Sequence, residues 1–329
     1  MPYDIITIGS AFKDVYLFSK KFKVLKNVKM ITGEMECFAF GTKIELEDMH
    51  VEIGGGAVNT AATFKRQGFK VGCLARIGKD SAGDDVRQYL KKHGINDLLA
   101  IDRKNKTAQS VVFLAPNGER TILVYRGAAH DFKTSDISPV ITQAKWLYVT
   151  SLAGRTDVLK KIITQAKQKG VRVAFNPGKL DITKGRSALL LLLKKIDILI
   201  MNNEEAATLT GRPITDETGY VRKLRGLCPG ILVITKGAQG SVVVLNGAMH
   251  RVIIKPLKAI DTTGAGDAFG SGFVAGYVRF KGDINKSIQL ACNNSAGEVS
   301  QLGAKNGLIG LTGPWKKVSY SIKKVNLHK

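Results

Sequence analysis

Short apolar segments alternate with helical segments along most of the chain, and this order constrains the fold more than any other feature. Residues 4–10 form an apolar run that ends in glycine and serine, as a buried parallel strand does. Further strand-like segments lie at 71–78, 146–151, 171–177, 197–202 and 231–237, and helical segments at 58–68, 81–94 (with Ser81 as its expected cap) and 157–169. Strands that alternate with helices predict a mainly parallel sheet covered on both faces.

Two segments interrupt this alternation. Residues 104–127 contain two strand-like runs around Asn117-Gly118, which is a strong hairpin-turn signal. Residues 13–52 also alternate as antiparallel strands do. We therefore expect a small β-sheet lid, built from about 13–52 and 104–127, on the main sheet. No linker, repeat or low-complexity tract divides the chain, so residues 1–329 are predicted to form one domain.

The composition is that of a globular α/β protein with a strong positive charge. Hydrophobic residues make up 44% and aromatic residues 7%, and the formal net charge is +23. Such a charge attracts polyanions, including nucleic acid and phosphorylated metabolites. Because the lysines are scattered along the chain, we favour a generally basic surface and expect no specific nucleic-acid partner. A nucleic-acid-binding or regulatory protein remains the alternative from another class.

Cysteine usage and hydropathy indicate the compartment. The four cysteines show neither a disulfide pattern nor metal-ligand spacing, which predicts a reducing cytoplasm. The first ten residues lack the basic and long apolar parts of a signal peptide. The longest apolar run, residues 188–193, is too short to span a bilayer and is expected to be a buried helix.

Polar and glycine-rich groups recur where predicted strands and helices meet. Asp14, residues 202–205 and residues 235–240 follow strands, whereas the glycines at 54–56 and the stretch "IDTTGAGDAFGSGFVAGY" at 260–277 precede helices. In open parallel sheets, ligands bind beyond the carboxyl ends of the strands. Each group alone is weak evidence, but their shared position predicts one ligand site at that edge.

The stretch at 260–277 combines an anion-binding turn with an acid. Gly264, Ala265 and Gly266 precede a helix expected to start near Asp267, so free amides and the helix dipole would hold an anion there. A carboxylate beside such an anion hole suits a general base that deprotonates a hydroxyl during phosphoryl transfer. The plainer interpretation, with Asp267 as a helix cap and the glycines serving close packing, fits the spacing equally well.

In these residues the sequence resembles the PfkB/ribokinase family of carbohydrate and nucleoside kinases. Residues 261–274, "DTTGAGDAFGSGFV", are similar to its C-terminal signature, and residues 54–78 to its N-terminal signature. The resemblance covers essentially the whole chain. It implies a ribokinase-like three-layer α/β/α sandwich with a mainly parallel sheet and a small β-sheet lid. It also implies ATP-dependent transfer of the γ-phosphoryl group to a hydroxymethyl group of a small sugar or nucleoside.

The resemblance implies roles for individual residues. Asp267 would be the base and Gly264–Gly266 the anion hole, while Asp14, Gly54, Gly55 and Asn59 would bind the acceptor. Asn202 and Glu205 match an N-x-x-E element that acts on Mg²⁺ through water, although a simple helix start explains them as well. The resemblance implies nucleotide contacts for the turn at Thr235, Gly237 and Gly240, for which an ordinary hairpin turn is the plainer interpretation. It implies a contact with the base for Asn293 or Cys292 on a later helix, which a simply packed helix explains as well. Asp261 and Thr263 resemble positions that bind K⁺ in some members.

The acceptor pocket combines features of several subfamilies. Gly56 stands where ribokinases usually have a lysine, which weakens a ribose-specific interpretation. Arg126 resembles an arginine of ketodeoxygluconate kinases, but a solvated edge-strand charge explains it slightly better. Ala129 replaces the asparagine of a "GAN" element. The alternatives are therefore a sugar-acid kinase and a nucleoside kinase; a hydroxymethylpyrimidine or pyridoxal kinase is disfavoured by the lid and the glycine cluster. A homodimer through the lid is expected from the family.

Overall fold

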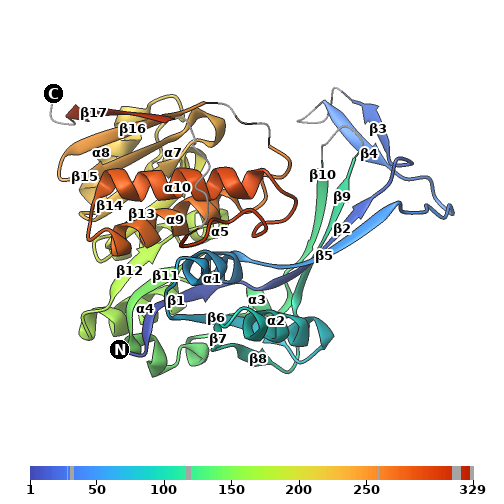
Figure 1. The fold of residues 1–329 in the computed structure, drawn as a ribbon, viewed down its shortest axis with the longest axis horizontal. Coiled ribbons are helices and arrows are strands. Elements are labelled where there is room, and N and C mark those ends of the chain that lie inside the picture. The colour runs from blue at the N-terminus through green and yellow to red at the C-terminus, as the bar shows by residue number, and fades with distance from the viewer. Residues whose placement is uncertain are drawn as a thin grey trace.

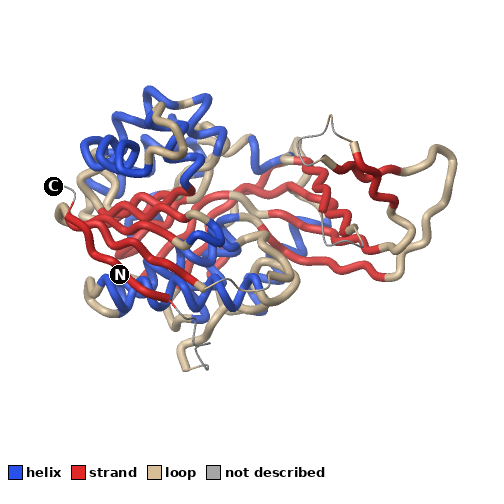
Figure 2. The backbone as a smooth tube through the Cα atoms, turned by 90° about the horizontal axis from the view of Figure 1, so that it is seen from above, coloured by secondary structure: helices blue, strands red, loops and turns tan. Residues whose placement is uncertain are grey.

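The main body is one mixed sheet of eleven strands between two layers of helices (Figures 1 and 2). A computed structural model describes residues 1–27, 29, 33–115, 120–255, 257, 259–312 and 320–326. The strand order is β17-β16-β15-β14-β13-β12-β11-β1-β6-β7, with β8 also paired to β6. Pairings from β14 through β13, β12, β11 and β1 to β6 are parallel, whereas β15, β16 and β17 are antiparallel. The predicted mainly parallel sheet is thus confirmed, with an antiparallel margin.

The strands of the body are short and mostly apolar, and the central ones are buried on both faces, as parallel strands between helices must be. Their bounds are β1 Tyr3–Gly9, β6 Val71–Gly78, β7 Asn96–Asp97, β8 Ala100–Asp102, β11 Ala144–Val149, β12 Arg172–Phe175, β13 Ile198–Asn202, β14 Ile231–Thr235, β15 Ser241–Leu245, β16 Ala248–Ile254 and β17 Tyr320–Asn326.

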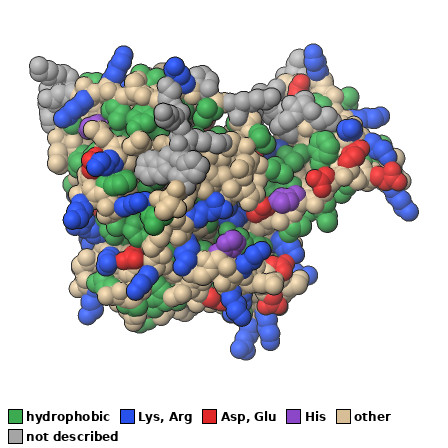
Figure 3. Space-filling view, in the orientation of Figure 1, with side chains coloured by type: hydrophobic (Ala, Val, Ile, Leu, Met, Phe, Trp, Pro, Cys, Tyr) green, Lys and Arg blue, Asp and Glu red, His purple; other side chains and the backbone are tan. Residues whose placement is uncertain are grey.

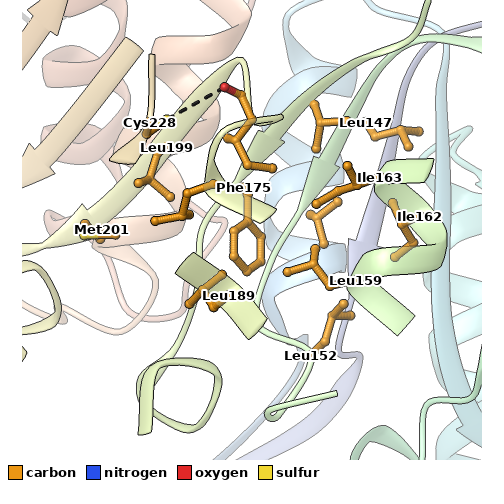
Figure 4. Close-up of a cluster of buried hydrophobic side chains, with 14 of the residues drawn as sticks. Leu147, Leu152, Leu159, Ile162, Ile163, Phe175, Leu189, Leu199, Met201 and Cys228 are labelled. Atoms are coloured by element: carbon orange, nitrogen blue, oxygen red, sulfur yellow. Dashed lines mark hydrogen bonds between the residues drawn. The ribbon is translucent and has the colours of Figure 1, made fainter. Parts of the chain in front are cut away.

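Helices cover both faces of the sheet, which confirms the α/β/α sandwich. One face packs against α1 Gly56–Arg66, α2 Ser81–Lys92, α9 Ala265–Arg279 and α10 Ile284–Val299. The other packs against α4 Thr156–Gln168, α5 Lys179–Lys184, α6 Arg186–Leu193, α7 Asn203–Thr210 and α8 Glu217–Leu227, and a short helix, α3 Gly127–His130, follows the lid. Figure 4 shows the second interface, where Phe175 packs among Leu159, Ile163 and Leu189.

A second sheet extends away from the body and forms the predicted lid (Figure 2). We call this four-stranded sheet, of order β10-β9-β2-β5, the lid sheet. Its strands are β2 Phe12–Phe18, β5 Asp48–Gly54, β9 Ala108–Leu114 and β10 Arg120–Tyr125, while β3 Lys23–Lys26 and β4 Glu34–Cys37 pair separately. β2 lies antiparallel to β5 but parallel to β9, so the two chain segments join side by side.

Several local expectations need correction. The cap of α2 is Asp80, whose side chain accepts a hydrogen bond from the amide of Gly83, and not Ser81. The helix expected to start near Asp267 begins at Ala265. Residues 188–193 lie in α6, but Leu191 is 73% exposed, so this helix is buried on one side only. The expected turn at Asn117-Gly118 lies outside the described residues.

Candidate active site

The turn before α9 has the backbone geometry of an anion-binding helix start. Gly264 caps the helix in the left-handed region, at φ 95°. A Cβ built on Gly264 would lie 2.5 Å from the Cβ of Ala304, so only glycine fits this conformation here. Ala265 and Gly266 follow as the first helical residues, with free space around Gly266. The amide of Ala265 makes one long hydrogen bond, of 3.3 Å, to the carbonyl of Thr262, and the amides at this helix start together with the helix dipole can hold an anion.

Asp267 lies in the first turn of α9 and is not its cap. Its Oδ2 accepts a hydrogen bond from Nδ2 of Asn59, on α1, at 3.0 Å, which joins the two signature segments across 208 residues. Burial raises the pKa of Asp267 to about 6, and the hydrogen bond from Asn59 opposes that shift. A carboxylate that titrates close to neutral pH is well suited to accept a proton.

Asp14 lies on β2 of the lid sheet and faces the glycine cluster. Its Oδ1 accepts a hydrogen bond from Ser110 Oγ, on β9, at 2.5 Å. A Cβ built on Gly54 would lie 2.1 Å from Asp14 Oδ2, so the glycine makes room for this carboxylate. Gly55, at φ 93°, would clash with the backbone of Ser10 if it carried a side chain. The predicted acceptor residues Asp14, Gly54, Gly55 and Asn59 therefore lie close together.

A cavity of about 420 Å³ lies between the turn after β14 and helix α10. Its polar floor is formed by Asn202, Thr235 and the backbone of Gly237 and Gly240, beside the start of α9. Its apolar part includes Phe269, Leu257, Ile254, Ala296 and Val299. An apolar cavity wall next to glycine backbone suits a nucleotide, with the base on the apolar side and the phosphates on the amides.

A second cavity of about 360 Å³ joins the proposed base to Asn202 and Glu205. These two residues form a capping box at the start of α7: Asn202 Oδ1 accepts from the Glu205 amide at 2.8 Å, and Glu205 Oε2 from the Asn202 amide at 2.9 Å. The plainer interpretation is thus confirmed, yet both side chains also line the cavity. Burial raises the pKa of Glu205 to about 7, so a cation would stabilise its ionised form.

Asp261 precedes the anion-binding turn and stabilises it. Its two carboxylate oxygens accept hydrogen bonds from the amides of Thr263, at 2.8 Å, and Gly303, at 3.1 Å. Within the described part of the chain, Thr263 Oγ1 and both carboxylate oxygens of the buried Glu298 have no hydrogen-bond partner. Burial, with the nearby charges of Asp261 and Asp267, raises the pKa of Glu298 to about 9. Oxygen atoms left unpaired in this way are the atoms a cation would bind.

Arg126 and Asn293, like Asp14, Gly54, Gly55 and Asn59, are not among the described residues that line the two cavities. Arg126 precedes α3 as its cap and is exposed. On α10, Cys292 and Ser295 line the first cavity, whereas the side-chain Nδ2 of Asn293 donates to the carbonyl of Gln289 at 2.8 Å. Of the two alternatives on this helix, Cys292 thus lies in the cavity lining, and the roles of Arg126 and Asn293 stay predictions.

Glycine is required at position 56 because the side chain of Thr150 lies against it, a contact that the sequence did not indicate. A Cβ at Gly56 would lie 2.6 Å from Thr150 Oγ1, at the end of β11, so no lysine side chain could start there without moving Thr150. Thr150 also lines the second cavity, together with Ser151 and Asn176. These three polar groups follow β11 and β12, so the strand-end rule could have identified them.

Sequence reasoning also missed the groups that surround Asp14. Ser110 and Lys305 belong to no motif, and each acts on a residue more than 90 positions away. Glu52, on β5, accepts hydrogen bonds from Lys305 and Asn306. No local pattern in the sequence indicates these pairings.

The described residues lack both a membrane-spanning helix and a cluster of metal ligands. In the described ranges no helix is long and apolar enough to cross a membrane, and no three His, Cys, Asp or Glu side chains gather as a metal cluster. All four cysteines are unpaired. On the face in Figure 3, lysine and arginine side chains are dispersed and do not form one basic stripe. This agrees with the scattered lysines of the sequence.

Comparison with known proteins identifies what this arrangement is similar to. The profile of the pfkB family carbohydrate kinases matches residues 4–309. A fructokinase of Klebsiella pneumoniae is 30% identical over 236 residues, which cover 68% of this chain and 76% of that protein. A cytidine kinase of Thermococcus kodakarensis is 29% identical over 230 residues, 69% of this chain and 80% of that protein. A structure of an Escherichia coli protein, described as a putative ribokinase II in complex with ATP and Mg²⁺, superposes with a TM-score of 0.78 at 20% identity, over 94% of this chain and 96% of that one.

Proposed function

We propose that this chain, which belongs to the pfkB family of carbohydrate kinases, transfers the γ-phosphoryl group of ATP to a hydroxymethyl group of a small sugar or nucleoside. The observation that carries the proposal is the position of Asp267. Its carboxylate lies at the start of α9, beside an anion-binding turn, and Asn59 holds it from the opposite signature segment. Base and anion hole are thus next to each other, as phosphoryl transfer to a hydroxyl requires.

The proposed reaction assigns one role to each group. The acceptor hydroxyl gives its proton to Asp267 as its oxygen forms a bond to the γ-phosphorus. The bond between that phosphorus and the β–γ bridging oxygen breaks, and ADP leaves. The amides of Gly264, Ala265 and Gly266 stabilise the negative charge on the transferring group. Asp14, oriented by Ser110, accepts hydrogen bonds from acceptor hydroxyls beneath the lid sheet.

ATP and Mg²⁺ are the proposed donor and cofactor. The nucleotide cavity offers Thr235, Gly237 and Gly240 to the phosphates and an apolar slot beside Cys292 to the base. Asn202 and Glu205 would hold Mg²⁺ through water, where the ion would neutralise phosphate charge. The ATP and Mg²⁺ named for the Escherichia coli structure support this assignment.

K⁺ is proposed at Asp261 and Thr263, next to the anion-binding turn. The unpaired Oγ1 of Thr263 and the unpaired oxygens of Glu298 fit a cation site, because a bound ion would compensate their burial. There the ion would stabilise the turn and add positive potential to the anion hole.

The names of the relatives and the exposure of Arg126 favour an uncharged sugar or nucleoside over a sugar acid. Arg126, which the sugar-acid alternative needs, is exposed at the start of α3. The names fructokinase and cytidine kinase among the relatives support both remaining acceptor classes.

We also propose a cytoplasmic location and a homodimer through the lid sheet. All four cysteines are unpaired, which is typical of a reducing compartment. The edge strand β10 exposes Ile122, Leu123, Val124 and Tyr125, a row of apolar side chains that a second copy would cover. A nucleic-acid-binding role has weaker support, since the basic side chains are dispersed over the face that Figure 3 shows.

An acceptor panel tests the function. ADP release is measured with ribose, fructose, ketodeoxygluconate, adenosine, cytidine and inosine, with Mg²⁺ and with or without K⁺. We expect acceptor-dependent turnover with an uncharged acceptor and none with Asp267→Asn. ATP turnover with no acceptor in the panel, combined with salt-sensitive retention of RNA or DNA at physiological ionic strength, would instead support the nucleic-acid alternative.

A further inference from the structure

Lys305 is a buried cation with no role in the proposed reaction. Its side chain is 3% exposed and lies in the turn after α10. Nζ donates to the carbonyl of Ile53 and to Glu52 Oε2, at 3.3 Å, and lies 5.3 Å from the ring centre of Tyr89. Burying a lysine is costly unless each of its donors is paired, so this set of contacts constrains the local structure strongly.

These contacts connect the body to the end of a lid strand. Glu52 and Ile53 lie near the end of β5, directly before Gly54, which makes room for Asp14, and Gly55, which makes room for the backbone of Ser10. Glu52 is held further by Asn306 Nδ2, at 2.9 Å, and by His50 Nε2, at 2.8 Å. Lys305 and Asn306 therefore fix the point where the lid sheet meets the glycine cluster.

The charge of Lys305 also acts on Asp14. Burial raises the pKa of Asp14, while the hydrogen bond from Ser110 and the charge of Lys305 oppose that shift. The carboxylates of Glu52 and Asp261 act in the opposite direction, and less strongly than Lys305. Other charged or titratable groups around this cluster are Tyr16 on β2, His50 on β5, Arg66 on α1, Tyr89 on α2 and His93 at the end of that helix, Arg120 on β10 and Glu298 on α10.

We propose that Lys305 is a positioning residue for the acceptor: it holds the end of β5 and the glycine cluster in place beside Asp14, and its ammonium group offsets the negative charge of Glu52 and Asp14 there. The inference rests on the proposed function, because it concerns the acceptor half of that site. Lys305 does not touch the acceptor. It acts through the backbone of Ile53 and through the field at Asp14.

Binding of the acceptor as a function of pH tests this role. The probe is ribose, fructose or cytidine, whichever the wild type phosphorylates, and its Kd is measured by calorimetry. All variants carry Asp267→Asn, so that the titration of Asp267 does not overlap with that of Asp14. We expect Lys305→Met to weaken binding at least tenfold at pH 6 and to move the acid midpoint of binding upward. Glu52→Gln should move the midpoint downward, and Lys305→Arg should stay near the wild type.

A matched control and a ligand-free measurement separate this role from simple stabilisation. Lys13, on β2, pairs with Asp85, on α2, at 2.6 Å and also joins the lid sheet to the body. Lys13→Met should change neither Kd nor midpoint. Hydrogen exchange of the amides at 53–56, without ligand, should accelerate in Lys305→Met and stay unchanged in Lys13→Met.

The outcomes distinguish this inference from the proposed function. If Lys305→Met does not fold, the double variant Lys305→Met/Glu52→Gln removes both charges together and should still bind with a midpoint slightly above that of the wild type. A folded Lys305 variant with unchanged Kd, midpoint and exchange overturns the inference while the kinase function stands. A wild type that phosphorylates no acceptor overturns the function itself.

Discussion

The two halves of the proposed site are built from different parts of the polypeptide. The nucleotide half is mostly backbone: the turn at Gly264–Gly266, the strand-end turn at Thr235–Gly240 and small residues on α9 and α10. The acceptor half consists of charged and polar side chains, Asp14, Ser110, Glu52 and Lys305, from four separate segments. A backbone site needs glycines at fixed spacing, whereas a side-chain site needs partners brought together by the tertiary fold.

The largest effect is expected at the point where the two halves meet. Asp267→Asn should lower kcat by about a thousandfold or more, because it removes the base and keeps the shape of the side chain. Binding of a non-hydrolysable ATP analogue, measured by calorimetry, should be unchanged. Turnover within tenfold of the wild type would remove Asp267 from its role.

A pair of glycines tests the backbone-built half. Gly264→Ala should lower kcat about a hundredfold and also lower Tm, since its Cβ would meet Ala304 at 2.5 Å in a left-handed conformation. Gly266→Ala is the control, because no atom lies within 4 Å of its Cβ and the residue is helical. Its Tm, measured by calorimetry, should not fall. Equal losses of Tm in the two variants would contradict the steric argument.

Substitutions in the acceptor half, which is built from side chains, should weaken binding of the acceptor and leave kcat unchanged. Ser110→Ala removes the 2.5 Å hydrogen bond to Asp14 and should raise the acceptor KM about tenfold, or ~1.5 kcal/mol, with kcat and the ATP KM nearly unchanged. Thr121→Ala, at an exposed position on the adjacent strand β10, is the control. A change in the ATP KM as large as that in the acceptor KM would show that the halves are not separable.

The pH dependence sharpens the same contrast. Asp267 must be ionised to accept a proton, and burial raises its pKa to about 6, so kcat should fall about tenfold per pH unit below pH 6. Because the folded protein favours the protonated form, the contribution of this group to stability is lost as pH rises through about 6. Asp267→Asn should therefore have a higher Tm than the wild type at pH 8. An acid limb near pH 4 would indicate an unperturbed aspartate.

The smallest effect is expected at the capping box of α7. Asn202→Ala should cost about 1 kcal/mol of unfolding free energy, because the Glu205 amide loses its acceptor. Asn202→Asp keeps an acceptor oxygen and should retain most of that stability in urea unfolding. Equal losses in both variants would show that the cap is not the source of the effect.

The same division explains how far the sequence could be interpreted. The turn at Gly264–Gly266, the base Asp267 and the order of strands and helices follow from local pattern and resemblance, and the fold confirms the order. Arg126 was assigned from resemblance alone, and it is exposed at the start of α3. On α10 the sequence left Asn293 and Cys292 as alternatives, and Cys292 is the one that lines the cavity. Ser110 and Lys305 could not be found, because their partners lie 96 and 253 positions away.

The pairing of β2 with β9 has a consequence for how the chain acquires its structure. Residues 12–18 are synthesised almost one hundred residues before their parallel partner at 108–114, and β1 also needs β11, at 144–149. Closing such long loops is slow compared with forming helices. The lid strands therefore spend much of synthesis with an unpaired edge. During expression, aggregation and chaperone dependence should arise mainly from this N-terminal segment.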